Sequence, residues 1–235
     1  MTTKYGKLFL IPNFLSDDNE DDFIAGHVRR MVNHLTHFVV ENEKQARALI
    51  KRINLSHPQA ELKIWLLNEH TKAQEISGLL AALENADAGI ISDAGLPCVA
   101  DPGSSLVALA QTKGIEVIPL PGASSIILTL MGSGFNGQQF SFVGYIPIDK
   151  AQRIKRIKEL EGVASKGVSQ IFMETPYRNN HLLTDLLANV NSNAMLCIGC
   201  KVGSNAGWVK TKTIAKWKIE TPDLHKQPCI FILGV

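Results

Sequence analysis

A chain of 235 residues with 45% apolar and 20% charged residues has the composition of an ordinary folded protein, and its length allows one large α/β domain or two small ones. The net charge of +2 is too small for a general nucleic-acid footprint, so any RNA contact must come from local patches. No apolar run approaches the ~18 residues of a membrane helix, and no signal-peptide core follows Met1, so we expect a cytoplasmic protein that does not enter a membrane.

Metal and disulfide chemistry are not expected. The four cysteines are too few and too scattered for a disulfide framework and indicate a reducing compartment. Cys197 and Cys200 form a CxxC inside an apolar run, where positions i and i+3 of a strand face opposite sides, so we interpret them as buried structural residues. His34 and His37 lack a third ligand nearby.

The first half of the chain alternates short apolar runs with helical periodicity. Strands are expected at residues 7–11, 36–41, 62–67 and 88–92. Helices are expected at residues 23–32, after the acidic run 17–22, at 43–53, and at 71–83, where Thr71 and Gln74 have the spacing of a capping box. This alternation predicts right-handed crossovers and a mainly parallel sheet, with residues 1–120 as one domain.

The second half has a different order of elements. Helices are expected at residues 124–131, closed by Gly132, at 149–166 and at 179–190, and strands at 139–143, 168–173, 194–202, 208–213 and 228–234. Strands that follow one another without helices predict a mixed sheet, in a second α/β domain over residues 121–235. Residues 132–137 spell GxGxxG without a preceding strand or a following helix, so we interpret them as a glycine-rich linker between domains.

Two of the apolar runs end in loops rich in glycine and proline. Residues 92–103 read Ser-Asp-Ala-Gly-Leu-Pro-Cys-Val-Ala-Asp-Pro-Gly, and residues 119–125 read Pro-Leu-Pro-Gly-Ala-Ser-Ser. Ligands in open α/β sheets bind outside the carboxyl ends of strands, and glycine lets a ligand approach the backbone. Two further motifs are Phe-Ser-Phe-Val-Gly-Tyr-Ile-Pro at residues 140–147 and Glu-Thr-Pro-Tyr-Arg at residues 174–178.

Together these motifs resemble the tetrapyrrole-methylase superfamily of S-adenosylmethionine-dependent methyltransferases. Within it they are most similar to the bacterial enzymes that methylate a ribose 2′-hydroxyl of small-subunit ribosomal RNA. The resemblance implies two α/β domains with a cofactor cleft between them, S-adenosylmethionine as cofactor, and a homodimer. Carried over by motif, the expected cofactor contacts are Asp93, Ala94, Gly95, Leu96, Ser124, Ser125 and Met173. Asp101 either caps the following helix or touches ligand.

The resemblance is weaker near the amino end. The ribosomal RNA enzymes carry Thr-Pro-Ile-Gly-Asn after the first strand and Glu-Asp-Thr-Arg after the second, whereas this chain has Ile-Pro-Asn-Phe-Leu at residues 11–15 and Glu-Asn-Glu-Lys at residues 41–44. A ribose hydroxyl is a poor nucleophile, so a base or a cation beside it would help. The polar candidates near the mouth of the cleft are Glu41, Lys44, Tyr177, Arg178 and Lys201, for each of which a surface salt bridge is the alternative.

Three functions stay open, of which methylation of RNA is favoured. The loop at residues 92–103 looks like that of the RNA branch, whereas the porphyrinoid branch usually has a shorter Gly-Asp-Pro loop there. Basic segments at residues 150–158 and 201–218, the latter with Trp208 and Trp217, would supply phosphate contacts and a stacking surface, although a solvated basic face is the simpler interpretation of the first. The alternatives are methylation of a tetrapyrrole or other small molecule, and a non-catalytic cofactor-binding relative.

Overall fold

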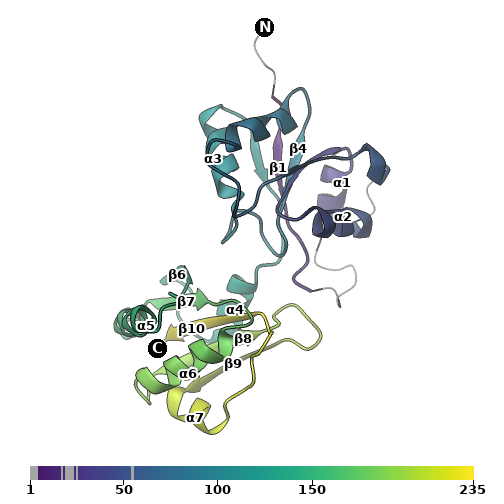
Figure 1. Cartoon of the computed structure of the whole chain (residues 1–235). Coiled ribbons are helices and arrows are strands. Elements are labelled where there is room, and N and C mark those ends of the chain that lie inside the picture. The colour runs from purple at the N-terminus through teal and green to yellow at the C-terminus, as the bar shows by residue number, and fades with distance from the viewer. Residues whose placement is uncertain (1–4, 17, 19–23, 25, 54–55) are drawn as a thin grey trace. The chain divides into compact units, whose positions relative to one another are not determined.

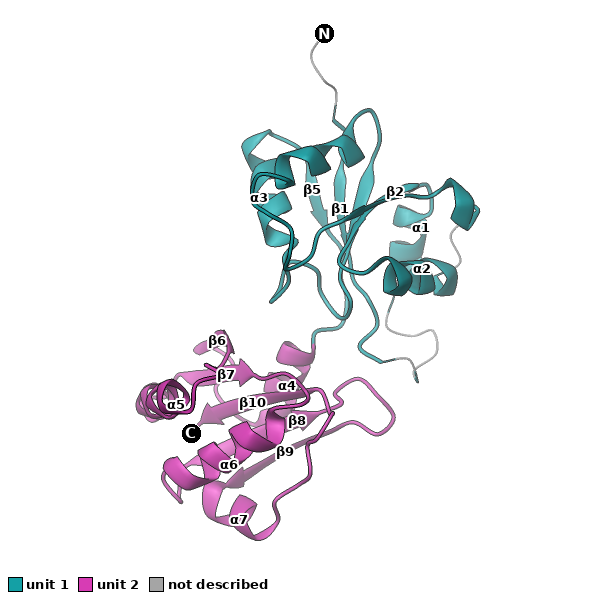
Figure 2. Ribbon diagram, in the orientation of Figure 1, with its two compact units in different colours: residues 1–124 teal, residues 125–235 magenta. Residues whose placement is uncertain are grey.

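The computed structural model describes residues 5–16, 18, 24, 26–53 and 56–235, which form two compact units, residues 1–124 and 125–235 (Figures 1 and 2). Apart from Asp18, the acidic run predicted to precede the first helix lies outside the described residues, as does the predicted start of that helix at Phe23. Within the described part of the chain, no helix has the length and apolarity to cross a membrane.

Unit 1 contains a parallel sheet of five strands in the order β3-β2-β4-β1-β5. Along the chain its elements are β1 (Leu8–Ile11), α1 (Gly26–Val32), β2 (His37–Val40), α2 (Glu43–Arg52), η1 (Gln59–Glu61), β3 (Lys63–Leu66), η2 (Ile76–Leu83), β4 (Ala88–Ile91), α3 (Ser104–Thr112) and β5 (Val117–Pro119). The central strands β1 and β4 consist of apolar residues and glycine because both faces of the sheet are covered.

Alternate residues of each strand in unit 1 enter two separate cores. Helices α1 and α2 lie on one side of the sheet and α3 on the other (Figure 2). Phe9 and Phe38 pack with α1 and α2, whereas Leu8 and Ile90 pack with η2 and α3. Gly89 lies between the side chains of Ile11 and Phe38, which a Cβ atom would overlap. Because side chains alternate between the two faces of each strand, the sheet has a core and covering helices on both faces. The carboxyl ends of the strands are left uncovered at the edge of the sheet.

Unit 2 contains a mixed sheet in the order β6-β7-β10-β8-β9, in which only β6 and β7 run parallel. Its elements are α4 (Ser125–Ser133), β6 (Phe140–Tyr145), α5 (Lys150–Ala164), β7 (Ser169–Met173), α6 (Asn179–Asn189), β8 (Met195–Cys200), β9 (Trp208–Thr213), α7 (Ile214–Ile219) and β10 (Cys229–Gly234). The prediction of a parallel sheet followed by a mixed one is confirmed. Cys197 faces the core beneath α4 and Cys200 faces the opposite core, as expected for a strand.

Two local predictions are wrong, and one helix was not predicted. Residues 76–83 form a 3₁₀ helix without the expected capping box, because the Thr71 hydroxyl accepts a bond from Asn68 N and Lys72 N bonds to Glu75. The glycine-rich run 132–137 lies inside unit 2 and does not link the two units. Helix α4 includes its first two residues and ends at Ser133, and the rest of the run leads into β6. Helix α7 was not expected, since Ile-Ala-Lys-Trp-Lys-Ile alternates like a strand, but the Thr213 hydroxyl caps it.

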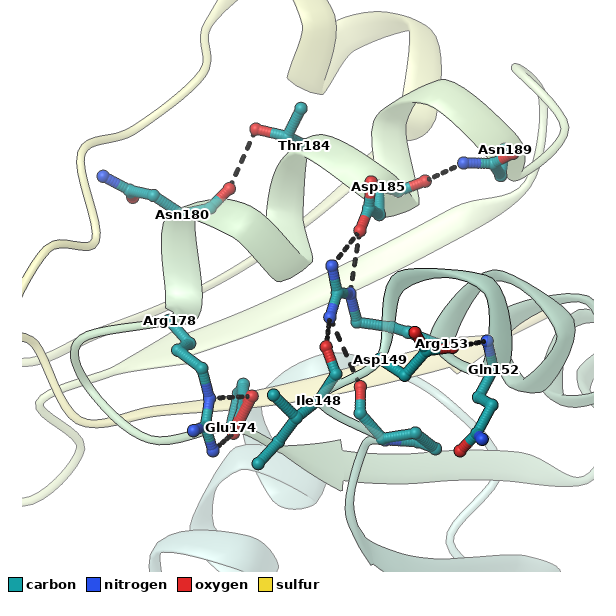
Figure 3. Close-up of polar contacts among 11 residues, drawn as sticks. Ile148, Asp149, Gln152, Arg153, Glu174, Arg178, Asn180, Thr184, Asp185 and Asn189 are labelled. Carbon is teal, nitrogen blue, oxygen red and sulfur yellow. Dashed lines mark hydrogen bonds and ion pairs between the residues drawn. The ribbon is translucent and has the colours of Figure 1, made fainter.

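A buried ion pair joins α5 to α6 (Figure 3). Arg153 donates from Nε and Nη2 to Asp185 Oδ2 at 2.8 and 2.7 Å, and from Nη1 to the carbonyl oxygens of Pro147 and Ile148 at 3.3 and 2.6 Å. Asp149, the N-cap of α5, accepts from Gln152 N at 2.9 Å. Because every bond of Arg153 is directed inward, this residue fixes the turn between β6 and α5.

Candidate functional site

The loops that follow β1, β4 and β5 meet at one edge of the unit 1 sheet. These three strands are neighbours and run parallel, so their carboxyl ends lie side by side. The backbone of Pro121–Ser124 lies beside the first loop, where a Cβ atom on Gly122 would overlap Pro12 and one on Gly95 would lie 3.7 Å from Ala123 O. The two glycine-rich loops predicted from the sequence are thus brought together, with the segment after β1 between them.

Asn13 connects the segment after β1 to the loop after β4. Its backbone N donates to Gly95 O at 2.7 Å, and its amide Nδ2 donates to Ser92 O and Asp93 O at 2.8 and 3.0 Å. Its Oδ1 accepts from Phe14 N at 2.7 Å. Asn13 is only 8% exposed and Ser92 is buried, so the carbonyl group of Ser92 would have no partner without this amide. Asn13 therefore determines the shape of residues 92–95.

The loop after β4 has an unusual backbone that its own side chains support. Gly95, Cys98 and Ala100 have φ values of +69°, +69° and +58°, the left-handed region that is costly for residues with a Cβ atom. Asp101 Oδ1 accepts from Cys98 N at 3.1 Å and from Gly103 N at 2.8 Å. Asp101 thus bonds to the N-cap residue of α3, and it stabilises the strained turn that exposes Asp93 and Ala94.

Glu41 joins this loop from the neighbouring strand β2. Its Oε2 accepts from Asp93 N at 3.4 Å. Burial, followed by the negative charge of Asp101, raises the pKa of Glu41, and the same two causes raise the pKa of Asp93. A carboxylate whose pKa is raised toward neutrality is a better proton acceptor. Sequence analysis placed Glu41 and Asp93 in one site, and in unit 1 they do lie together.

The remaining candidates in unit 1 have simpler surroundings. Lys44 lies in the first turn of α2, where its backbone N bonds to the N-cap Asn42 Oδ1 at 3.0 Å and its side chain is exposed. Leu96 is half-buried in the first loop, and Ser124 is half-buried at the end of the unit. Lys44 therefore has no described contact with the glycine-rich loops.

The candidates in unit 2 lie at the ends of its strands. Ser125 begins α4, where its carbonyl accepts from the Thr129 hydroxyl at 2.7 Å. Met173 ends β7 and is half-buried. Lys201 follows β8 with φ +48° and donates from its backbone N to Pro228 O at 2.9 Å.

Arg178 is held by Glu174 (Figure 3). Its Nε and Nη2 donate to Glu174 Oε2 and Oε1 at 2.6 and 2.7 Å, and Thr175 N donates to Oε1 at 2.8 Å. Burial opposes ionisation of Glu174, but these bonds outweigh burial and hold the pKa of Glu174 below its usual value. The bonds that Arg178 donates to Glu174 raise the pKa of Arg178. The pair shapes the turn after β7, from which Tyr177 projects exposed, with Lys226 Nζ 5.9 Å from its ring.

The prediction of a basic surface with stacking aromatic residues is wrong for Trp217 and Arg153. Trp217 is 1% exposed and its Nε1 donates to Leu196 O at 2.8 Å, so it belongs to the core and cannot stack on a base. Arg153, from the basic segment 150–158, is buried against Asp185. Arg156 and Lys158 of that segment are exposed but pair with Glu159 and Glu161. The simpler interpretation, a solvated face, fits the exposed part of α5.

Sequence reasoning missed Asn13. The available signal was its position, directly after Pro12 at the end of a buried strand, where the relatives' Thr-Pro-Ile-Gly-Asn pattern is replaced. The pairing of Asn13 with residues 92–95 spans some 80 positions of the chain and appears only when β1 and β4 become neighbours.

Comparison with known proteins finds relatives in sequence and in fold. No protein-family model matches the chain. The protein named ribosomal RNA small subunit methyltransferase I of Halalkalibacterium halodurans is 30% identical over 194 residues, which cover 82% of this chain and 63% of that protein. The protein of the same name from Pseudomonas aeruginosa is 30% identical over 182 residues, covering 77% and 61%. The chain thus spans about three fifths of the length of these curated relatives.

Solved structures show the same fold. A conserved hypothetical protein from Aeropyrum pernix K1 matches with a TM-score of 0.68 and 13% identity, covering 99% of this chain and 85% of the other. The methyltransferase CobJ matches with a TM-score of 0.63 and 15% identity, and uroporphyrin-III-C-methyltransferase from Thermus thermophilus with 0.56 and 16%, each covering 97% and 94%. At these identities the structures establish fold alone. The resemblance seen in the sequence is confirmed: the chain is similar to proteins named ribosomal RNA small subunit methyltransferase I and has the fold of the tetrapyrrole methylases.

The role of Asn13 is tested by Asn13→Asp. The substitution keeps the acceptor for Phe14 N but turns a carboxylate oxygen toward the carbonyls of Ser92 and Asp93, so we expect a loss of about 2 kcal/mol or more in unfolding free energy and faster proteolysis of the loop. Urea titration and limited proteolysis measure both. Asn42→Asp is the matched control, because an aspartate caps a helix as well as asparagine does. Equal stability of the two variants would contradict the role given to Asn13.

Proposed function

We propose that this protein is an S-adenosylmethionine-dependent methyltransferase that modifies RNA, at a ribose 2′-hydroxyl of small-subunit ribosomal RNA, in the cytoplasm. The observation that most directly supports this proposal is the convergence of the two glycine-rich loops around Asn13, beside the half-buried Glu41. The relatives named as ribosomal RNA small subunit methyltransferase I support the substrate class. The three neighbouring structures, at 13–16% identity, support the fold and carry no argument for a tetrapyrrole substrate.

The residues at the sheet edge fit the cofactor. Asp93 and Ala94 are exposed on the turn after β4, and Gly95, at φ +69°, has no atom closer than 3.2 Å to the position that a Cβ atom would take. Asp93, Ala94, Gly95 and Leu96 of the first loop would hold the cofactor, with Ser124, Ser125 and Met173 as further contacts. The carboxyl groups of Glu41 and Asp93 would favour a positively charged ligand such as a sulfonium. When bound, S-adenosylmethionine supplies an electrophilic methyl group.

Glu41 is the group that we assign to proton transfer. Its carboxyl lies at the end of β2, held by Asp93 N and bordered by Asp101. In its ionised form it accepts the proton of the hydroxyl group that attacks the methyl, and its raised pKa makes it a stronger base than an exposed glutamate. Asp101 Oδ1 is already engaged by Cys98 N and Gly103 N.

The function is tested by transfer of tritiated methyl groups to small ribosomal subunits from a strain that lacks the protein. Ribonuclease-sensitive label is expected with the wild type, and Glu41→Gln should lower kcat/KM by roughly 10²–10⁴-fold while cofactor affinity changes little. As pH falls through the raised pKa of Glu41, its base form is lost and the wild-type rate should fall. Glu43→Gln, which removes an exposed carboxylate two residues away, is the control. Label on a tetrapyrrole and none on RNA would overturn the substrate assignment.

Cofactor binding is tested by Gly95→Val. At a hundredfold excess of S-adenosylmethionine over its dissociation constant, the wild type should gain about 2.7 kcal/mol of stability. The variant should lose this gain, because a valine at φ +69° distorts the loop and its Cβ lies 3.2 Å from Leu15. Gly114→Val is the matched control, since Gly114 has φ +67° and open space around it at the end of α3. Calorimetry without heat for the wild type would reject the cofactor.

The assembly that we propose is a two-fold homodimer, the commonest form of soluble homo-oligomers. Light scattering at micromolar concentration should give about twice the chain mass of 25.7 kDa. A mass equal to that of one chain would count against the dimer and leave the site within each chain unaffected.

A further inference from the structure

A cavity borders the first glycine-rich loop within unit 1. It has a volume of about 200 Å³ and lies between the segment after β1 and helix α2. Its walls include Asn13, Phe14, Ser16, Gln45, Arg52 and Asp93. Asp93 and Ala94 belong both to this cavity and to the predicted cofactor loop, so the cavity lies beside that loop. None of the residues assigned above to cofactor binding from the second loop lines it.

Arg52 gives the cavity its chemistry. Its guanidinium carbon lies 3.6 Å from the centroid of the Phe14 ring, and Nη1 makes one long bond of 3.5 Å to Ser16 O. Nη2 is buried and has no hydrogen-bond partner among the described residues. Buried donors are almost always satisfied, and a guanidinium stacked on an aromatic ring keeps its N–H groups available in its plane. Nη2 of Arg52 therefore lacks an acceptor, and an oxyanion bound in the cavity would supply one.

The position of Arg52 is coupled to the cofactor loop through Asn13. Phe14, which supports the guanidinium, is buried and has its backbone N bonded to Asn13 Oδ1. The amide of the same Asn13 bonds to the carbonyls of Ser92 and Asp93. The loop and the guanidinium are therefore held at a constant separation by one buried side chain, which suits two parts of one substrate complex.

The charge of α2 favours a polyanion as ligand. The helix carries Lys44, Arg47, Lys51 and Arg52 against Glu43 as its only acidic residue. Arg47 is engaged with Glu43 and with Gln59 O, whereas Lys51 points to solvent. Among these four, Arg52 alone combines a buried donor that lacks a partner with a position in the cavity wall. Arginine is also the side chain best suited to the paired oxygens of a phosphate.

We propose that Arg52, stacked on Phe14, binds a backbone phosphate of the RNA substrate next to the nucleotide that is methylated. The inference rests on the function proposed above and names the group that anchors its substrate. Arg52 is a binding residue that positions the RNA and takes no part in proton transfer. A volume of about 200 Å³ is large enough for a phosphate group.

The test measures binding of an unmodified small-subunit ribosomal RNA transcript at graded salt, by filter binding, for the wild type, Arg52→Gln, Arg52→Lys and Lys51→Gln. Arg52→Gln should weaken binding about tenfold at low salt and reduce the slope of log affinity against log salt by about 0.7 to 0.9. Arg52→Lys keeps the charge and should retain most of the slope while losing part of the affinity. Lys51→Gln, the matched loss of one charge from the same helix, should match the wild type.

Calorimetry with S-adenosylmethionine and thermal melting accompany each variant. Unchanged cofactor affinity and melting temperature are expected, since Arg52 is outside the cofactor contacts. A loss of cofactor binding in Arg52→Gln would assign the guanidinium to the cofactor carboxylate and overturn the proposal. Equal losses in Arg52→Gln and Lys51→Gln would show that only net charge matters, which also overturns it. If the wild type methylates RNA and Arg52→Gln binds it normally, this inference fails alone; if the wild type neither binds nor methylates RNA, the proposed function fails with it.

Discussion

One buried amide group determines the geometry on which the candidate site depends. The loop after β4 turns back on itself with non-glycine residues in the left-handed region, and such a backbone persists only where the surroundings hold it. Asp101 holds the strained residues of that loop, and Asn13 fixes its first residues by donating to the carbonyl groups of Ser92 and Asp93 and accepting from its own neighbour Phe14. No apolar side chain could replace Asn13, because the carbonyl group of buried Ser92 would lose its partner.

Both acidic and basic side chains lie near Asn13. Glu41, Asp93 and Asp101 lie on the side of β2 and β4, where their proximity and burial raise the pKa of Glu41 and Asp93. Arg52 lies on α2, in the wall of a cavity that Asp93 also borders. In the proposed complex the carboxyl groups would attract the sulfonium and the guanidinium would attract the phosphate.

Unit 2 uses buried ion pairs for a comparable purpose. Arg153 and Asp185 connect the turn after β6 to α6, and Glu174 and Arg178 close the turn after β7 (Figure 3). Breaking either pair would leave a charge in a poorly hydrated place, which costs more than the pair contributes when intact. Their effect is to give the strand ends of the mixed sheet one defined conformation, as Asn13 does for the parallel sheet.

The sequence by itself determined the order and type of most elements, because apolar periodicity and the alternation of runs and loops depend on local chemistry. It also indicated the two glycine-rich loops, because they follow apolar runs at strand ends, and the resemblance indicated Glu41 as a candidate near them. Only the tertiary structure decided the rest. The clamp by Asn13, the stacking of Arg52 on Phe14 and the burial of Trp217 depend on which segments become neighbours, and residues such as Asn13 and Ser92, 79 positions apart, carry no local signal of their bond.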